Sequence, residues 1–325
     1  MIIENSKTYN VNEVEDLFFR PSFCGKSAEE LGVRVLYNMP TPTKIPSFGH
    51  HSNIVKPFMS GWQGSVVNDY TENEIYLTKL KAENTYSAES YYSTIYEMLI
   101  NSGSVNLGDL TGTDLEKAET ELFRRSIVES IYGTMWFGDE DGEISSFDSF
   151  PGFLRKMIDI SNDDEESSIT LYPERVDADI DVLFGNVWLD ANDDLRAMAA
   201  DGQLAFFVSS DIYDSYHFWL DRQGLTNVVA EARGTRPTLL FHGIPVVEVP
   251  GYKYNRLRAK SFCILTDRRN LILALNTADS PEKEIRMWYN PDEMENRQRV
   301  VFLAGTAIAD SNLISAYIYD KGVNL

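Results

Sequence analysis

The strongest pattern in the chain is helical and lies in residues 113–137. Apolar side chains recur there at steps of three and four residues: Leu115, Ala118, Leu122, Phe123, Ile127, Ile131 and Met135. Thr113 and Glu116 form a capping box at the start, because each side chain can accept a hydrogen bond from the other residue's backbone amide. The glycine- and acid-rich residues 138–142 end the pattern. We expect one helix of about 35 Å, since each residue adds about 1.5 Å.

Residues 1–52 show neither a helical nor a strand period. Four prolines interrupt them, at positions 21, 40, 42 and 46. Such a segment is either disordered or an extended arm that lies on another surface. Its apolar content exceeds that of a typical disordered tail, which favours the arm: Leu17, Phe18, Phe19, Phe23, Leu31, Val33, Val35, Leu36 and Tyr37.

Strand-like alternation begins at residue 60 and continues to 83. Val66 and Val67 precede a polar turn at residues 68–73, and residues 75–82 alternate in polarity after it. This pattern predicts a long β-hairpin. Because an isolated two-stranded hairpin is only marginally stable in water, it needs a partner surface in the same chain or in another copy. Residues 86–100 are expected to form a short helix ending at Gly103.

The second half of the chain mixes shorter helices and strands, so the fold class is α+β with an antiparallel bias. We expect a helical piece after Phe153, an acidic loop at 159–166 and an acidic segment at 177–181. Helices are predicted at 193–200 and from Ser209 or Ser210 to Gly224. Strands are predicted at 204–208, 239–249 with a turn at Gly243, 262–275 with a hairpin turn at 267–270, 285–289, 299–309 and 314–319.

Charge narrows the function. The 50 acidic and 29 basic residues give a formal net charge of -21, which opposes binding to nucleic-acid phosphates and anionic lipid surfaces. Contacts between copies would depend on apolar packing and local charge pairing, and would be sensitive to salt. The two cysteines, Cys24 and Cys263, indicate reduced thiols. No signal peptide and no membrane-spanning stretch is recognised.

Candidate chemistry is sparse. Asp177, Asp179 and Asp181 open like a calcium loop, but Val182 stands where glycine is required and Trp188 where glutamate is required. The motifs for a nucleophilic serine, a phosphate-binding loop and a dinucleotide site are missing. We expect His217 to be a packed residue of a helix and His242 to lie in a turn. The sequence therefore predicts no catalytic site, no cofactor and no metal.

Two groups of residues are candidates for contacts between subunits. The first is the basic cluster Lys253, Arg256, Arg258 and Lys260, which is either a solvated loop or a patch that pairs with an acidic loop of a neighbouring copy. The second belongs to the predicted hairpin and is either part of the core or a contact surface: Trp62, Tyr70, Tyr76 and Leu80.

In the order and spacing of these elements the chain resembles the major capsid proteins of tailed double-stranded DNA bacteriophages, which have the Hong Kong 97 phage capsid fold. The resemblance covers nearly the whole chain. One similar feature is the glycine-acid turn at Gly138 and Asp139, followed by Phe150-Pro151-Gly152-Phe153-Leu154. The other similar segments are residues 204–210, 240–247, 265–271 and the strand 300–305.

The resemblance implies a division of the chain. It implies an N-arm at 1–52, an extended loop at 53–84, a peripheral domain at 85–190 with its spine helix at 113–137, an axial domain at 191–255 and return strands at 256–325. Some family members begin with a scaffolding segment. The early extended loop leaves no room for one here, so a separate scaffolding protein is expected if Met1 is the true start. Lys56, Lys79 and Lys81 could take part in cross-links known in some members, but no asparagine partner is identified.

The function implied is assembly. Copies of the chain would form hexamers and pentamers of an icosahedral head that encloses double-stranded DNA without sequence-specific binding and without a membrane. A portal and decoration proteins would be partners. The expected location is the virion, after synthesis in the host cytoplasm. Two alternatives stay open: an encapsulin-like compartment shell, and a hydrolase whose site is not recognised.

Overall fold

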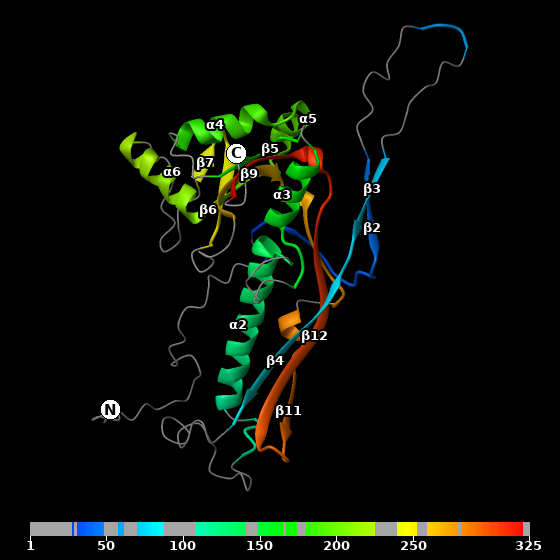
Figure 1. The fold of residues 1–325 in the computed structure, drawn as a ribbon, viewed down its shortest axis with the longest axis vertical. Helices are drawn as coiled ribbons and strands as arrows, with labels where there is room; N and C mark the ends of the chain where they lie inside the picture. Colours follow the sequence, from blue (N-terminus) through cyan, green and yellow to red (C-terminus); the bar gives the residue numbers. More distant parts are fainter. Residues whose placement is uncertain are drawn as a thin grey trace. The chain divides into compact units, whose positions relative to one another are not determined.

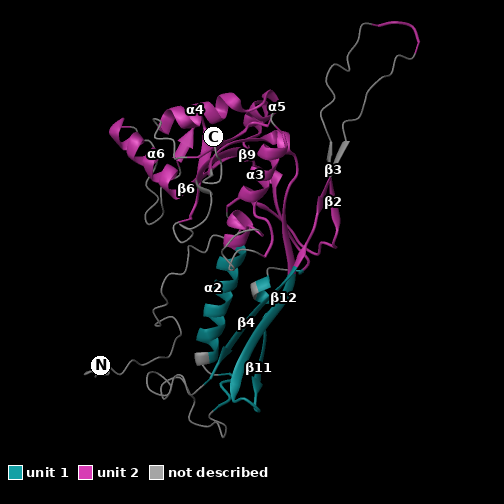
Figure 2. Ribbon diagram, in the orientation of Figure 1, with its two compact units in different colours: residues 1–25, 79–131, 277–302 teal, residues 26–78, 132–276, 303–325 magenta. Residues whose placement is uncertain are grey.

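The computed structural model describes residues 28, 31–48, 58–61, 70–87, 108–112, 114–140, 149–164, 167–173, 180–224, 239–251, 259–278 and 281–320. The chain divides into two compact units (Figure 2). Unit 1 comprises residues 1–25, 79–131 and 277–302, and unit 2 comprises residues 26–78, 132–276 and 303–325. The chain passes between the units within helix α2 (Asp114–Phe137) and within strand β12 (Glu295–Ile308).

Unit 1 packs the first part of α2 on an antiparallel sheet (Figure 1). Strand β11 (Arg286–Asn290) pairs with the first part of β12, from Arg286 opposite Arg299 to Asn290 opposite Glu295. Strand β4 (Thr78–Tyr86) also pairs with β12. The amide of the buried Gln298 donates to the Thr120 hydroxyl of α2 at 2.8 Å. The helix therefore covers one face of this sheet. A short 3-10 turn, η7 (Pro281–Lys283), precedes β11.

Helix α2 confirms the predicted helix at residues 113–137 and ends at the predicted Phe137. The Glu116 carboxylate accepts a hydrogen bond from the Gly112 N–H at 2.6 Å, and the other half of the expected capping box, Thr113, lies outside the described residues. Ala118, Phe123 and Ile127 are buried, in keeping with the apolar stripe, whereas Leu122, expected in the same stripe, is exposed.

The last turns of α2 are buried on all sides in unit 2. The Trp136 ring lies 5.3 Å from that of Phe153, 5.4 Å from Phe207 and 6.3 Å from Phe262, measured between ring centroids. The helix ends at Gly138, whose N–H donates to the Thr134 carbonyl at 2.8 Å. A side chain at Gly138 would meet the carbonyl oxygens of Phe150 and Thr134, so glycine is required at this turn.

The main sheet of unit 2 has six strands. Their order is β5 (Ile169–Tyr172), β13 (Ile314–Asp320), β9 (Ala259–Asp267), β6 (Leu204–Ser209), β8 (Ile244–Val249) and β7 (Leu239–Phe241). The β5–β13 and β6–β8 pairs are parallel and the others antiparallel. Every residue of β6 is buried. The helices of this unit are α3 (Phe153–Asp163), α4 (Ile180–Asp190), α5 (Asp193–Ala197) and α6 (Ser210–Arg222).

Aromatic residues form the core between α4, α6 and this sheet. The Phe184 ring of α4 lies 5.1 Å from the Phe206 ring of β6 and 4.7 Å from the Tyr216 ring of α6. At the start of α6, the hydroxyls of Ser209 and Ser261 both donate to the Asp211 carboxylate at 2.5 Å. Ser209 is the N-cap residue as expected, although its side chain makes no capping hydrogen bond.

Unit 2 also holds β1 (Arg34–Leu36), β10 (Leu271–Leu275) and the second part of β12. Strand β10 pairs in parallel with β1 and antiparallel with β12. A separate two-stranded ribbon pairs β2 (Thr43–Phe48) with β3 (Tyr70–Ile75), from Thr43 opposite Ile75 to Phe48 opposite Tyr70. Three 3-10 turns complete this unit: η3 (Met198–Asp201), η6 (Arg268–Asn270) and η8 (Ser311–Leu313).

Several predicted elements are confirmed. The helix over 193–200 corresponds to α5 followed by η3, and the strand over 204–208 to β6. The strands predicted around Gly243 are β7 and β8, and the turn between them has positive φ at His242 and Gly243. The three C-terminal strands are β11, β12 and β13.

Other predictions are wrong. Residues 70–73, expected as a turn, belong to β3, and the partner of β3 is β2 from the segment expected to be an arm. Leu31 and Val33, from the same segment, are buried within the chain itself, so this part needs no other copy to cover it. Tyr86, expected to begin a helix, ends strand β4, and residues 88–100 of that predicted helix lie outside the described residues.

The strands at 262–275 do not form the predicted hairpin. Strand β9 pairs with β6 and β13, whereas β10 pairs with β1 and β12, so the turn at η6 passes the chain from one sheet to another. Part of the predicted acidic loop at 159–166 is helical, because α3 continues to Asp163. Helix α4 and strands β1, β2 and β5 were not predicted from the sequence. Within the described residues, no helix is both long and apolar enough to cross a membrane.

Candidate subunit-contact surfaces

The β2–β3 ribbon is fastened to unit 2 at one end. Ile75 and Leu77 are buried against Ile272, Ala274 and Ala307. The Asn73 amide donates to the carbonyl oxygens of Ile308 at 3.2 Å and of Ala309 at 2.5 Å. These contacts hold the base of the ribbon, while the antiparallel ladder continues as far as the pair of Phe48 and Tyr70.

The chain leaves the ribbon by crossing β12 at Gly305. A Cβ atom at Gly305 would clash with the Tyr76 carbonyl oxygen and would lie 3.2 Å from Leu77 Cδ2. Glycine therefore permits a backbone-to-backbone approach that no side chain would allow. This crossing fixes where Tyr76 leaves the sheet.

Tyr76 is the predicted contact residue that the structure describes most fully. Its side chain is 68% exposed, and its hydroxyl donates to the Glu74 carboxylate at 2.5 Å. This hydrogen bond and the negative charge of Glu74 raise the pKa of the Tyr76 phenol. Lys44 of β2 pairs with the same carboxylate at 3.6 Å. Tyr76 is therefore a surface residue and not part of the core.

The other predicted contact residues are less informative. Tyr70 begins β3, and Leu80 is half-buried in β4. Lys260 lies in β9, and its side chain is not described. Trp62, Lys253, Arg256 and Arg258 lie outside the described residues. Tyr70, Tyr76 and Leu80 thus lie along one stretch of chain, with Tyr70 at the start of β3, Tyr76 between β3 and β4, and Leu80 in β4.

The structure adds exposed apolar residues that the sequence reasoning missed. Phe58 and Met59 are 97% and 63% exposed. On the six-stranded-sheet side of unit 2 there are four more: Val182 and Leu189 of α4, Phe218 of α6 and Leu240 of β7. The sequence of helix α4 could have indicated a contact surface, because its apolar residues extend around the whole helix. Such helices are normally covered on all sides.

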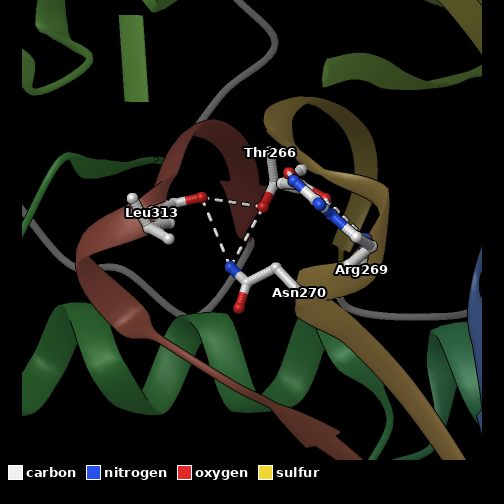
Figure 3. Close-up of polar contacts among 5 residues, drawn as sticks. Thr266, Arg269, Asn270 and Leu313 are labelled. Atoms are coloured by element: carbon white, nitrogen blue, oxygen red, sulfur yellow. Dashed lines mark hydrogen bonds and ion pairs between the residues drawn. The ribbon is translucent and has the colours of Figure 1, made fainter. Parts of the chain in front are cut away.

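A buried polar network fixes the junction between the two sheets of unit 2 (Figure 3). The Asn270 amide donates to the Thr266 hydroxyl at 3.1 Å and to the Leu313 carbonyl at 3.3 Å. It also donates to the Asp310 carbonyl at 2.9 Å. Its oxygen accepts from the Asp310 N–H at 2.8 Å. The Thr266 hydroxyl donates to the Leu313 carbonyl at 2.7 Å. One asparagine thus ties η6 to the segment before β13.

Arg269 and Asp267 form an ion pair beside this network, with Arg269 Nη2 at 2.5 Å from Asp267 Oδ2. Burial by itself would raise the pKa of the Asp267 carboxyl, but the side-chain and backbone hydrogen bonds from Arg269 outweigh it and lower the pKa. The pair is structural, because its groups lie within the turn that they stabilise.

Nothing in the described residues resembles a reactive centre. Cys263 is a free, fully buried thiol, and burial raises its pKa, which disfavours the reactive thiolate. His217 is half-buried and lies 3.6 Å from Asp221 on the same helix. No group of three or more potential metal ligands occurs in the part of the chain that the structure describes. Asp177 and Asp179 lie outside that part, and Asp181 lies in α4.

Comparison with known proteins gives a result only at the level of structure. No family model matches the sequence, and no curated protein matches it. Among solved structures, a chain of the satellite phage P4 procapsid matches with a TM-score of 0.55 at 12% identity, over 91% of this chain and 95% of the other. The capsid of the native GTA particle matches with the same TM-score and identity, over 98% and 96%.

The chain has the Hong Kong 97-like capsid fold. The resemblance deduced from the order of its elements is confirmed at this level, and so is the α+β class. The same fold also occurs in the SrpI encapsulin of Synechococcus elongatus PCC 7942, which matches with a TM-score of 0.51 at 9% identity over 90% of this chain and 87% of the other. The boundaries of the arm, loop, peripheral and axial domains stay predictions within this capsid fold.

Proposed function

We propose that this chain is a major capsid protein whose copies form the hexamers and pentamers of an icosahedral phage head. The observation that carries the proposal is the structural match to phage and GTA capsid chains over nearly the full length of both partners. A match that spans nearly the whole of both chains supports the use of the whole chain for assembly.

Surfaces that the single chain leaves uncovered support the same proposal. The β2–β3 ribbon is a two-stranded sheet, and such ribbons gain stability from a further surface. Tyr76, Phe58 and Leu189 are large side chains that are more than half exposed in the single chain. In the proposed shell, neighbouring copies cover them.

The finer parts of the proposal concern partners and contents. The shell would enclose double-stranded DNA, and the formal charge of -21 would limit adhesion of DNA to its wall. A separate scaffolding protein, a portal and decoration proteins would complete the particle. Assembly would take place in the host cytoplasm, and the mature protein would be located in the virion. Trp62, Tyr70, Tyr76, Leu80 and the basic cluster from Lys253 to Lys260 are proposed contact residues.

An encapsulin-like compartment is the second candidate, favoured by the match to the SrpI encapsulin chain. Such a shell would hold a protein cargo in place of a genome. The two candidates share the fold and the need for self-assembly, so the contents of the particle separate them.

Negative-stain microscopy of the expressed protein tests the proposal. We expect closed particles, and nuclease-protected DNA inside particles recovered from infected cells supports the phage head. Protected protein cargo without DNA would favour the compartment. A chain that stays at its monomer mass of 36.9 kDa under all conditions, including in the presence of its neighbouring gene products, contradicts both candidates.

A further inference from the structure

One face of the unit 1 sheet is basic, in a chain that is strongly acidic. Side chains alternate between the two faces of a strand. The buried Asn296, Gln298 and Val300 of β12 face α2, and the residues between them face away from it. The face away from α2 carries seven cationic or apolar side chains, which we call the basic face: Lys79 and Lys81 of β4, Arg297, Arg299 and Val301 of β12, and Arg286 and Trp288 of β11.

Contacts across the strands confirm that these residues share one face. Arg286 lies opposite Arg299, and Trp288 lies opposite Arg297. The Arg299 guanidinium carbon is 5.8 Å from the centre of the Trp288 ring, which is within the range of a cation–π contact. An ion pair of 3.6 Å joins Arg299 to Glu83 of β4, so the exposed residues of β4 belong to the same face.

The charges on this face do not balance. Its five cations meet three carboxylates: Glu83, Glu293 and Glu295. Lys79 and Arg286 have no carboxylate partner within the described part of the chain. The excess of positive charge stands in a chain with 21 more acidic than basic residues. The rest of the chain therefore carries the whole of the acidic excess.

The face also has the apolar component of a contact site. Trp288 is 42% exposed and Val301 is 44% exposed. Tryptophan and arginine are the side chains most often responsible for binding energy at protein interfaces. Lys81 and Arg299 keep 68% and 51% of their side-chain surface in solvent, so both can reach a partner.

We propose that the basic face binds a carboxylate-bearing surface of a second copy of this chain. The inference rests on the proposed function and names one of its contacts. Charge complementarity selects the occupant, because an acidic chain presents suitable carboxylates on its neighbours. Nucleic acid fits less well, since duplex DNA presents a negative charge about every 1.7 Å along its axis and would face Glu83, Glu293 and Glu295 as well as the cations.

The test compares two double variants of the full chain with the same change in charge. Arg286→Glu with Arg299→Glu reverses the basic face. Arg124→Glu with Arg222→Glu reverses two cations of helices α2 and α6 and serves as the control. A third protein, Arg286→Gln with Arg299→Gln, removes the charge without adding a repulsive one. Circular dichroism and thermal unfolding establish that all three fold, and sedimentation velocity then measures self-association at low and high salt.

We expect the wild type and the control to associate, with association falling as salt rises. The Glu variant should lose at least tenfold in association constant, and the Gln variant should lose less. Equal association of the Glu variant and the control would overturn the inference. If the wild type associates without closing into shells, the proposed function fails, and the variants still decide whether this face makes the contact. If the wild type does not associate at all, both are overturned.

A binding assay with a short DNA duplex tests whether the basic face binds nucleic acid instead of a second copy. We expect no binding by the wild type at physiological salt. Binding that the wild type and the control share, but that the Glu variant loses, would assign the face to nucleic acid and overturn the second copy as its partner.

Discussion

Single residues decide where the chain crosses itself. Gly305 allows the Tyr76 backbone to pass directly over β12, and no other residue type would fit without moving the two segments apart. Gly185, in the middle of helix α4, is the opposite case, because a Cβ atom there would meet nothing within 4 Å. Glycine is therefore required by close packing at Gly305 but not at Gly185.

This contrast gives the first prediction. Gly305→Ala should lower the free energy of unfolding by about 1–3 kcal/mol, the usual cost of overpacking. Gly185→Ala should raise it by about 0.5–1 kcal/mol, because alanine loses less conformational entropy in a helix. Urea denaturation of both variants measures the difference. An unchanged or more stable Gly305→Ala protein would show that the crossing at β12 is not as close as described.

The second prediction is that the fold loses stability when Asn270 is replaced. Replacing it with alanine leaves the carbonyl and the N–H of Asp310 without their side-chain partner, whereas the Leu313 carbonyl keeps its hydrogen bond from Thr266. Unsatisfied buried groups cost about 1–3 kcal/mol each, and partial relaxation should limit the total to about 2–4 kcal/mol. Asn290→Ala, on the half-buried end of β11, should change stability by less than about 0.5 kcal/mol. Equal effects in thermal unfolding would contradict the role of the network.

The third prediction concerns pH. Because the pKa of Asp267 is lowered in the folded protein, its pair with Arg269 stabilises the fold at pH values above the ordinary pKa of 3.8. That stabilisation is lost as pH falls through the lowered folded pKa. The Tm of Asp267→Asn should therefore lie below that of the wild type at neutral pH and approach it in acid. Asp194→Asn, at an exposed position of α5, is the control. A constant Tm difference at every pH would contradict this assignment.

At the scale of elements, local pattern was sufficient where contacts are local. The stripe of Ala118, Phe123 and Ile127 predicts α2 correctly, and the run from Leu204 to Val208 predicts β6. Both patterns reflect which side of an element faces the core. The local sequence indicates that side even when the element that packs against it is unknown.

Pairing between distant segments could not be predicted in the same way. Strands β9 and β10 follow one another across a short turn, so their sequence looks like that of a hairpin. Each strand has a continuous apolar run because it lies inside a sheet, and the two sheets are different. Strand β1 has three residues and pairs in parallel with β10, more than two hundred positions away. The three prolines near β2 concealed its pairing with β3, since proline is tolerated at sheet edges.

The candidate contact surface was predicted only in part. Tyr76 was expected to lie in the core or on a surface, and it is exposed. The outer residues of α4, including Leu189, were missed because an apolar helix in one sequence gives no indication of which side remains open. The pairing of Arg286 with Arg299 depends on strand register, which a single sequence does not specify.

The fourth prediction belongs to the junction of β3 and β4. Tyr76→Asp should leave the stability of the isolated chain unchanged within about 0.5 kcal/mol, because the side chain is exposed. It should strongly reduce particle formation, because a charge would enter a contact that excludes water. Tyr76→Phe keeps the ring, loses only the hydrogen bond to Glu74, and should assemble normally.

Light scattering during assembly measures the effect. Normal particles from Tyr76→Asp would remove Tyr76 from the proposed contacts and leave the fold unaffected. If neither variant forms particles, assembly depends on the Tyr76 hydroxyl and not on the aromatic ring alone.

At the scale of the whole molecule, two features act together. The chain uses nearly its full length in the capsid fold, and its large negative charge makes copies repel one another at long range. In the proposed shell, association would therefore need short-range contacts that are strong enough to overcome this repulsion. We propose that the exposed apolar residues supply apolar contacts and that the basic face of unit 1 supplies charged ones.

Cryo-electron microscopy of particles purified from cells that express the chain tests this account most directly. The account predicts closed icosahedral shells of hexamers and pentamers, in which neighbouring copies cover Tyr76 and the basic face. A homogeneous population of single chains, with those same surfaces open to solvent under every assembly condition, would contradict it.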